Sequence, residues 1–95
     1  MNIEILRRDY RNKILEIANI CHAEDIRVFG SSARGEAKID SDIDFLVHMK
    51  PDAGLGLCGL QWRLEELLKT KVDVVPDDNL HPRIKDRILK EAVPL

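Results

Sequence analysis

Three aspartates interrupt segments that otherwise have the composition of β-strands. Asp42 and Asp44 flank Ile43 in the run Asp-Ile-Asp-Phe-Leu-Val, and Asp73 lies within Val-Asp-Val-Val, although aspartate is depleted in strands. Because side chains alternate across a strand, Asp42 and Asp44 share one face, about 6.6 Å apart along the chain. If Asp73 lies on the neighbouring strand, three carboxylates converge and repel one another. A hard dication with oxygen ligands relieves that repulsion, and Mg²⁺ is the usual ion beside phosphates.

Gly30 and Ser31 follow the first short apolar segment, and ten residues separate Ser31 from Asp42. Glycine lets a backbone approach a ligand closely, and N–H groups exposed in such a turn bind anions, with the serine hydroxyl as a further donor. An acidic metal site beside an anion-binding turn is what phosphoryl or nucleotidyl transfer requires. A Gly-Ser turn alone, or a solitary Asp-x-Asp at a solvated strand edge, carries no such meaning. The combination, with Asp73 in a third segment, is specific.

Hydrophobic periodicity predicts the elements that position these residues. A helix over 3–22 has an apolar face of six positions, which are Ile3, Leu6, Tyr10, Ile14, Ile17 and Cys21. We expect strands at 26–29, 42–47 and 72–75, a helical turn at 33–37, a loop at 51–59 and a helix over 60–68. Pro82 suits the start of a last helix, which is expected to bury Ile84, Ile88, Leu89 and Ala92. This order predicts an α/β (α+β) fold, a small mixed sheet with helices packed on one face.

Length and composition restrict the class of protein. Ninety-five residues predict a single domain over 1–95, and 44% hydrophobic with 34% charged residues excludes collagen-like and disordered chains. No apolar run approaches the roughly 18 residues of a membrane span, and the N-terminus has no secretory signal. The two cysteines, Cys21 and Cys58, cannot form a disulfide framework. We therefore expect a cytoplasmic protein without membrane association.

The charge balance argues against nucleic acid as a direct partner. Fifteen Lys and Arg against 17 Asp and Glu give a net charge of −2, and only 4% of residues are aromatic. Proteins that hold nucleic acid mainly by its phosphates are normally basic, and those that bind single strands offer aromatic stacking platforms. A chain this short buries only about 60–65% of its unfolded surface. It is therefore expected to form a hetero-oligomer with a partner or a homo-oligomer.

The segments that carry these acidic and glycine residues resemble a known family. Gly-Ser-Ser-Ala-Arg-Gly-Glu-Ala at 30–37, followed by Ser-Asp-Ile-Asp at 41–44, is similar to the signature of the minimal nucleotidyltransferases of the DNA polymerase beta-like superfamily. Lys-Val-Asp-Val-Val at 71–75 matches the strand that carries the third carboxylate in that family. The resemblance runs from about Ile26 to the C-terminus, and it implies a nucleotidyltransferase fold.

The resemblance implies a role for each matching residue. Gly30 and Ser31 would hold the triphosphate of ATP, and Asp42 and Asp44 would ligate Mg²⁺. Asp73 would ligate one metal ion and help to deprotonate the acceptor hydroxyl.

Three nearby positions leave alternatives open. Arg34 would contact a phosphate or form a structural ion pair, and Ser41 suits a turn or a cap better than catalysis. Ser32 stands where relatives often carry a basic residue, which leaves nucleotide affinity in question.

Free-standing members of this size are typical antitoxins, whose partner is a HEPN-domain ribonuclease toxin. The resemblance implies that such an antitoxin transfers AMP from ATP to a tyrosine hydroxyl of the toxin. Two other functions are compatible with the residues. One is an antitoxin that acts by steric binding with weak or no catalysis, and the other is nucleotidyl transfer to a small-molecule hydroxyl.

Overall fold

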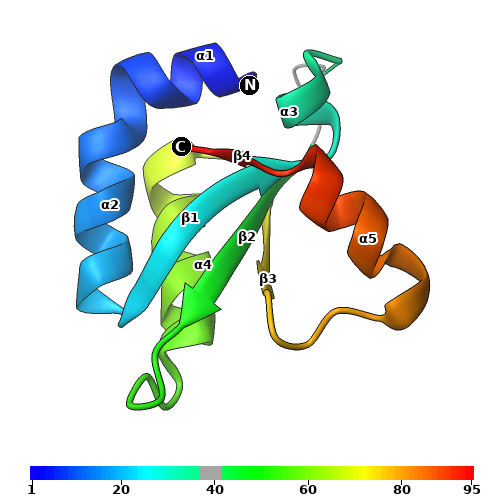
Figure 1. Cartoon of the computed structure of the whole chain (residues 1–95). Coiled ribbons are helices and arrows are strands. Elements are labelled where there is room, and N and C mark those ends of the chain that lie inside the picture. The colour runs from blue at the N-terminus through cyan, green and yellow to red at the C-terminus, as the bar shows by residue number, and fades with distance from the viewer. Residues whose placement is uncertain (37–41) are drawn as a thin grey trace.

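The computed structural model describes residues 1–36 and 42–95, whose strands form a sheet in the order β3-β2-β1-β4 (Figure 1). The bounds are Ala23–Phe29 for β1, Ile43–Met49 for β2, Val72–Pro76 for β3 and Val93–Pro94 for β4. Strand β2 pairs antiparallel with β1 and parallel with β3, while β4 pairs antiparallel with β1. The sheet is therefore small and mixed, as the sequence predicts.

The predicted first helix consists of three consecutive segments, which are α1 (Ile3–Ile5), the π-helical segment η1 (Leu6–Tyr10) and α2 (Arg11–Ile20). The other helices are α3 (Ser31–Arg34), α4 (Gly56–Leu68) and α5 (Pro82–Glu91). Asn2 caps the first turn, because its side-chain oxygen accepts a hydrogen bond from the Ile5 amide at 3.0 Å. Within the described residues, no helix has both the length and the apolar composition needed to cross a bilayer.

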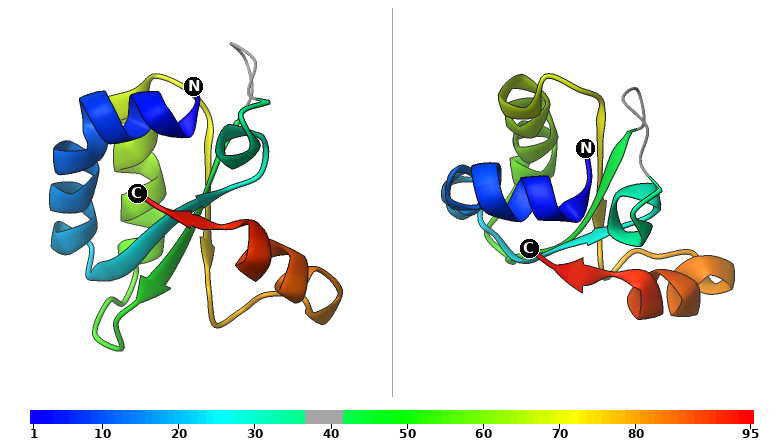
Figure 2. Two further views of the ribbon diagram at one scale, coloured as in Figure 1. Left: turned by 45° about the horizontal axis from the view of Figure 1, so that its top comes forward. Right: turned by 90° about the horizontal axis from the view of Figure 1, so that it is seen from above.

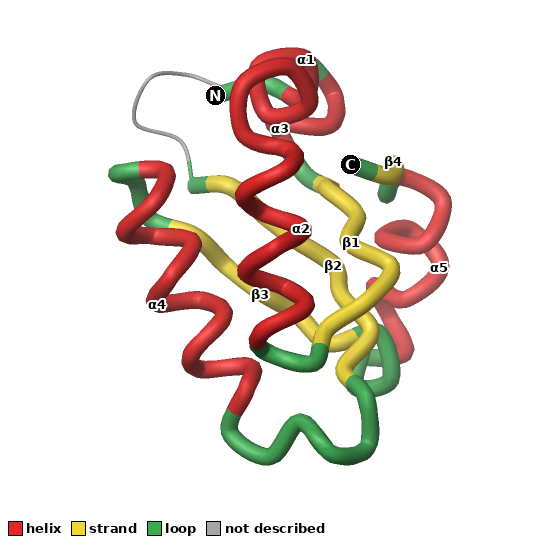
Figure 3. The backbone as a smooth tube through the Cα atoms, turned by 90° about the vertical axis from the view of Figure 1, so that its left-hand side faces the viewer, coloured by secondary structure: helices red, strands yellow, loops and turns green. Residues whose placement is uncertain are grey.

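The main hydrophobic core lies between the sheet and a layer formed by α2 and α4. Figures 2 and 3 show these two helices over one face of the sheet, with α5 on its opposite side. Ile43, Phe45 and Val47 of β2 are fully buried and belong to one core cluster with Ile14 of α2 and Leu64 of α4. The expected alternation along β2 is confirmed on this face. Asp44 must therefore project from the other face, toward the side on which α5 lies.

The last helix is less buried than its apolar spacing suggests. Helix α5 begins at Pro82 as predicted, but Ile84 and Leu89 are 40% and 39% exposed, and Ile88 alone within the helix is buried. Ala92 lies beyond the helix end and is partly buried. The prediction of a fully covered apolar face is wrong. Helices α2 and α4 cover each other as well as the sheet, whereas α5 stands apart from other long helices (Figure 2), so only the centre of its apolar stripe is covered.

Several boundaries differ from the sequence prediction: β1 begins three residues earlier, α3 begins at Ser31 rather than at 33, and β2 begins at Ile43, so that Asp42 precedes the strand. Helix α4 begins at Gly56, inside the segment expected to be a loop, and a Cβ on Gly56 would lie 2.3 Å from the Cys21 carbonyl oxygen. Glycine here allows α4 to approach the end of α2, rather than marking a loop. Strand β4 was not predicted, because two residues, Val93 and Pro94, give no periodic signal.

Candidate active site

Asp44 lies at the centre of the candidate site, between the Gly-Ser turn and the third predicted carboxylate. Across the antiparallel pair, Asp44 is opposite Phe29, the residue before Gly30. Across the parallel pair, Asp44 is opposite Asp73. Neighbouring strands are about 4.8 Å apart, and opposed residues project to the same face. The structure thus brings Asp44 and Asp73 together on the face away from the main core.

Gly30 makes the close approach that its residue type predicts, and the group it approaches is the Asp44 side chain. Its backbone has φ 73° and ψ −154°, a region essentially restricted to glycine. A Cβ at this position would lie 2.3 Å from Asp44 Oδ2. The Gly30 carbonyl oxygen accepts hydrogen bonds from the Ala33 and Arg34 amides at 3.1 and 3.2 Å, while the first amides of α3 have no partner within the helix. The Gly-Ser turn therefore lies against the Asp44 side chain, at the start of α3.

The surroundings of Asp44 raise its pKa above the ordinary value. Partial burial is the main cause, followed by the negative charges of Asp73 and Asp42 and, more weakly, of Glu91. The positive charge of Arg34 acts in the opposite direction. Repulsion among the three predicted carboxylates is therefore a feature of the folded chain.

The donor chemistry of this site suits a hard dication, because all three side chains offer carboxylate oxygens. The side chains are not already arranged as a cage, however. Among the described residues no three Asp, Glu, His or Cys side chains are spaced to hold an ion. Asp42 is exposed, and its Oδ2 lies 3.9 Å from Lys71 Nζ. The three side chains are chemically suitable ligands, and metal binding at Asp42, Asp44 and Asp73 stays a prediction.

Arg34 forms structural ion pairs, which is one of the two roles that the sequence leaves open for it. Its Nε donates a hydrogen bond to Glu36 Oε2 at 3.1 Å, and its Nη1 donates to Glu91 Oε1. Glu91, the last residue of α5, was not among the predicted site residues. No local pattern could have indicated it, since the contact joins two segments that are distant in the sequence.

Ser32 and Ser41 add little to the described site. Ser32 is buried, and its hydroxyl has no hydrogen-bond partner among the described residues, so it does not occupy the exposed position of a basic phosphate ligand. Ser41 lies outside the described residues. The phosphate-binding roles of Gly30 and Ser31 stay predictions.

His48 belongs to a separate polar cluster at the far end of β2. Its Nδ1 lies 3.0 Å from Asp77 Oδ1, and its Nε2 lies 3.8 Å from Glu24 Oε1. The hydrogen bond and charge of Asp77 raise the pKa of His48. Arg27 approaches the same Asp77 carboxylate at 3.7 Å. These contacts tie the ends of β1, β2 and β3 together and do not extend to Asp44.

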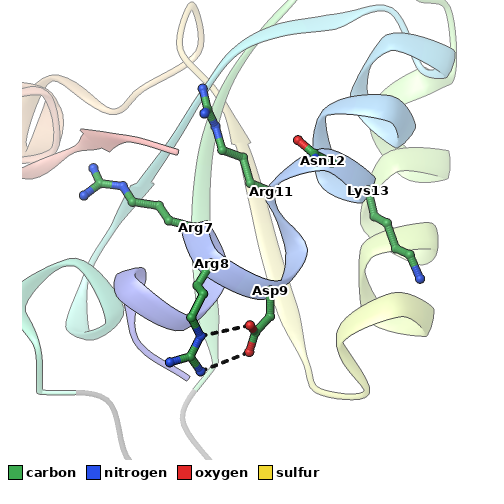
Figure 4. Close-up of a pocket in the computed structure, with 6 residues that line it drawn as sticks. All are labelled: Arg7, Arg8, Asp9, Arg11, Asn12 and Lys13. Carbon is green, nitrogen blue, oxygen red and sulfur yellow. Dashed lines mark hydrogen bonds and ion pairs between the residues drawn. The ribbon is translucent and has the colours of Figure 1, made fainter.

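A groove of about 370 Å³ runs along η1 and the start of α2, and none of the three site aspartates lines it (Figure 4). Arg8 and Asp9 pair with each other across two hydrogen bonds at its edge. Arg7 donates two hydrogen bonds to the Pro94 carbonyl oxygen and so attaches η1 to β4. Four of the six residues that line this groove are basic, and they are Arg7, Arg8, Arg11 and Lys13.

Relatives share this sequence over most of its length. The Nucleotidyltransferase domain family model matches residues 7–95. The protein MJ0435 of Methanocaldococcus jannaschii, named as a protein adenylyltransferase, is 43% identical over 94 residues, which span 98% of this chain and 97% of its own. The protein adenylyltransferase MntA of Thermococcus cleftensis is 43% identical over 70 residues, which span 73% of this chain and 71% of its own.

Solved structures give the same assignment. A structure described as a minimal nucleotidyltransferase superposes with a TM-score of 0.86 at 42% identity, covering 100% of this chain and 97% of that one. A toxin–antitoxin structure with AMP-PNP superposes with a TM-score of 0.75 at 22% identity, over 90% of this chain and 71% of that one, which shows a common fold. Sequence and structure agree, and this chain belongs to the nucleotidyltransferase domain family, among the minimal nucleotidyltransferases.

Proposed function

We propose that this chain is a Mg²⁺-dependent protein adenylyltransferase and the antitoxin of a toxin–antitoxin pair. It transfers AMP from ATP to a tyrosine hydroxyl of a cognate HEPN-domain ribonuclease. Support comes from the two relatives that are named as protein adenylyltransferases and from the toxin–antitoxin neighbour that contains AMP-PNP. Residues 1–95 act as one domain in this proposal, in the cytoplasm, where ATP and ribonuclease substrates are available.

The observation that carries the proposal is the position of Asp44 between Gly30 and Asp73. A nucleotide tail held at the Gly-Ser turn lies directly beside two carboxylates on neighbouring strands. Burial and repulsion raise the pKa of Asp44, so its ionised state is less favourable than that of an exposed aspartate when no cation is bound. The site therefore gains from a dication and a phosphate chain bound together.

The residues divide the chemistry of the transfer between them. The acceptor oxygen forms a bond to the α-phosphorus of ATP while the bond from that phosphorus to the β-phosphate oxygen breaks, and pyrophosphate leaves. Gly30 and Ser31 hold the triphosphate, and Asp73 helps to remove the proton from the acceptor hydroxyl. Asp42, Asp44 and Asp73 would hold Mg²⁺, which when bound supplies positive charge that offsets the charge on the phosphates. Positioning and electrostatics then provide most of the rate.

The test is transfer of AMP to a HEPN-domain protein co-expressed from the neighbouring reading frame. We expect mass spectrometry to find one or more added AMP groups on a tyrosine of that protein. Asp44→Asn is expected to lower the rate of labelling by at least about 100-fold, because it removes a proposed ligand of the cation that offsets the charge on the phosphates. Asp86→Asn, which removes an exposed carboxylate from α5, is the matched control and should label normally. Labelling that survives Asp44→Asn would reject the proposed site.

Ser32 favours one second candidate, an antitoxin that neutralises its partner by binding alone. A buried hydroxyl, which has no hydrogen-bond partner within residues 1–36 and 42–95, stands where relatives often have a basic side chain. The chain then has one cation fewer to bind a triphosphate. In this case the Asp44→Asn variant should still protect cells from the toxin. Loss of protection by a variant that still forms the complex would exclude binding alone.

A further inference from the structure

Glu91 is a carboxylate that the proposed reaction does not use, yet it lies next to the candidate site. Its side chain is only 15% exposed, and its Oε1 accepts a hydrogen bond from Arg34 Nη1. Arg34 also donates from Nε to Glu36, whose side chain is 65% exposed. One guanidinium therefore has two acidic partners of the same type, one nearly buried and one in solvent.

The Arg34–Glu91 pair is close to the carboxylates of the site. Arg34 is the last residue of α3, and its amide donates to the Gly30 carbonyl oxygen at 3.2 Å. The charges of both Arg34 and Glu91 act on Asp44, in opposite directions. Arg34 therefore follows the Gly-Ser turn directly, and its side chain pairs with Glu91 near enough to Asp44 for both charges to act on that carboxyl group.

The two contacts leave most of the guanidinium available to a ligand. Arginine has five N–H donors in a rigid plane, and Glu36 and Glu91 each accept one of them. The remaining donors have no acceptor in the part of the chain that the structure describes. The two contacts hold the guanidinium plane from two sides, at Nε and at Nη1. The N–H groups of Nη2 then point in a fixed direction, in which they can donate to phosphate.

We propose that Glu91 is a positioning residue, which holds the Arg34 guanidinium so that its free N–H donors meet the triphosphate of the bound nucleotide. This inference deepens the proposed function and depends on it for the identity of the ligand. It gives α5 a second task, since the helix that buries Ile88 also carries the residue that orients Arg34. Orientation reduces the entropy that a free arginine would lose on binding phosphate.

The alternative is that the ion pair only attaches α5 to α3. A purely structural attachment predicts that Glu91→Gln lowers the unfolding temperature, while nucleotide binding below that temperature is unchanged. A positioning role predicts weaker nucleotide binding by a folded protein. Nucleotide affinity, measured on the folded protein, therefore distinguishes the two roles whatever the change in stability.

The test measures the dissociation constant of Mg²⁺–AMP-PNP by calorimetry, well below the unfolding temperature of each variant. Glu91→Gln is expected to weaken nucleotide binding about tenfold, because it removes the charge-assisted hydrogen bond that orients the Arg34 guanidinium. Glu36→Gln removes the exposed partner of the same guanidinium and is expected to change the constant by less than about twofold, because exposed ion pairs contribute little. In transfer assays, Glu91→Gln should raise the KM for ATP about tenfold and change kcat by less than about twofold.

A double variant shows whether Glu91 acts through Arg34. Arg34→Ala with Glu91→Gln should bind no more weakly than Arg34→Ala alone, since nothing is left to position. Unchanged binding in Glu91→Gln, or losses that add in the double variant, would overturn the inference. A wild-type chain that binds Mg²⁺–AMP-PNP but labels no protein would reject the proposed acceptor while the binding comparison still decides the role of Glu91. A wild-type chain that binds no nucleotide would overturn both.

Discussion

At Gly30, the backbone conformation and the neighbouring Asp44 side chain impose separate requirements. Its φ of 73° is shared by Gly35 at the end of α3, whose φ is 74°. Space around the two glycines differs, because a Cβ at Gly30 would lie 2.3 Å from Asp44 Oδ2 and a Cβ at Gly35 would meet nothing within 4 Å. The backbones also differ, since ψ is −154° at Gly30 and 18° at Gly35. Gly35 therefore reports the cost of a left-handed backbone alone, whereas Gly30 adds a backbone region restricted to glycine and the displacement of a site carboxylate.

Gly35→Ala is expected to lower the free energy of unfolding by about 1–2 kcal/mol, the cost of a left-handed backbone for a residue with a Cβ. Gly30→Ala should cost more, because the methyl group must also displace Asp44. We expect urea denaturation to rank the two in that order, and AMP transfer to be lost in Gly30→Ala but retained in Gly35→Ala. Equal losses of activity in both variants would mean that the space beside Asp44 is not what the reaction needs.

Residue types and spacing predict three residues of the candidate site that the structure places side by side. Gly30 could be singled out because glycine lets a backbone approach a ligand closely, and Asp44 and Asp73 because aspartate is depleted in strands. Glu91 could not be found in this way, because a glutamate at the end of a helix is ordinary and its meaning comes from a tertiary contact with Arg34.

At the scale of elements, α5 shows what a periodic pattern can and cannot determine. Spacing indicated a helix from Pro82, but it did not show how much of the apolar stripe would be covered. Ile88 is buried at 4% exposure, whereas Ile84, one turn earlier on the same side, is 40% exposed. The attachment of α5 to the sheet thus depends on the Ile88 side chain more than on that of Ile84.

Ile88→Ala is expected to cost about 2–4 kcal/mol of unfolding free energy, the range for removing a buried branched side chain. Ile84→Ala serves as the matched control and should change stability by less than about 1 kcal/mol, since exposed positions lose little packing and alanine favours helix. Chemical denaturation of both variants measures the difference. Similar costs for the two would show that the whole apolar stripe of α5 is covered in solution.

For the whole molecule, the fold leaves large apolar side chains in solvent on the α4 side. Trp62 is 62% exposed and Leu55, just before α4, is 87% exposed. This exposure accords with the expectation that a chain of this length relies on a partner or a second copy. Oligomeric state stays a prediction, which the emission maximum of Trp62, alone in its residue type in the sequence, can follow during complex formation.

When no cation is bound, the carboxylate cluster of Asp42, Asp44 and Asp73 destabilises the folded chain. The pKa of Asp44 is raised in the folded chain, so the native state binds a proton more readily than the unfolded state. Stability must then fall as the pH rises from the unfolded value of about 3.9 through the folded pKa. At neutral pH, Asp44 is therefore a cost to the metal-free fold.

Asp44→Asn is accordingly expected to make the metal-free chain more stable than the wild type at pH 7, with a difference that shrinks as the pH approaches 4. Urea denaturation in the presence of a chelator measures both values, and Asp86→Asn on the exposed side of α5 should show no such difference. Adding Mg²⁺ should stabilise the wild type in proportion to the logarithm of its concentration above the dissociation constant, and should stabilise Asp44→Asn much less. A variant less stable than the wild type at pH 7 without metal would mean that the Asp44 carboxylate supports the fold, and the link between the acidic cluster and a cation would then lose its physical basis.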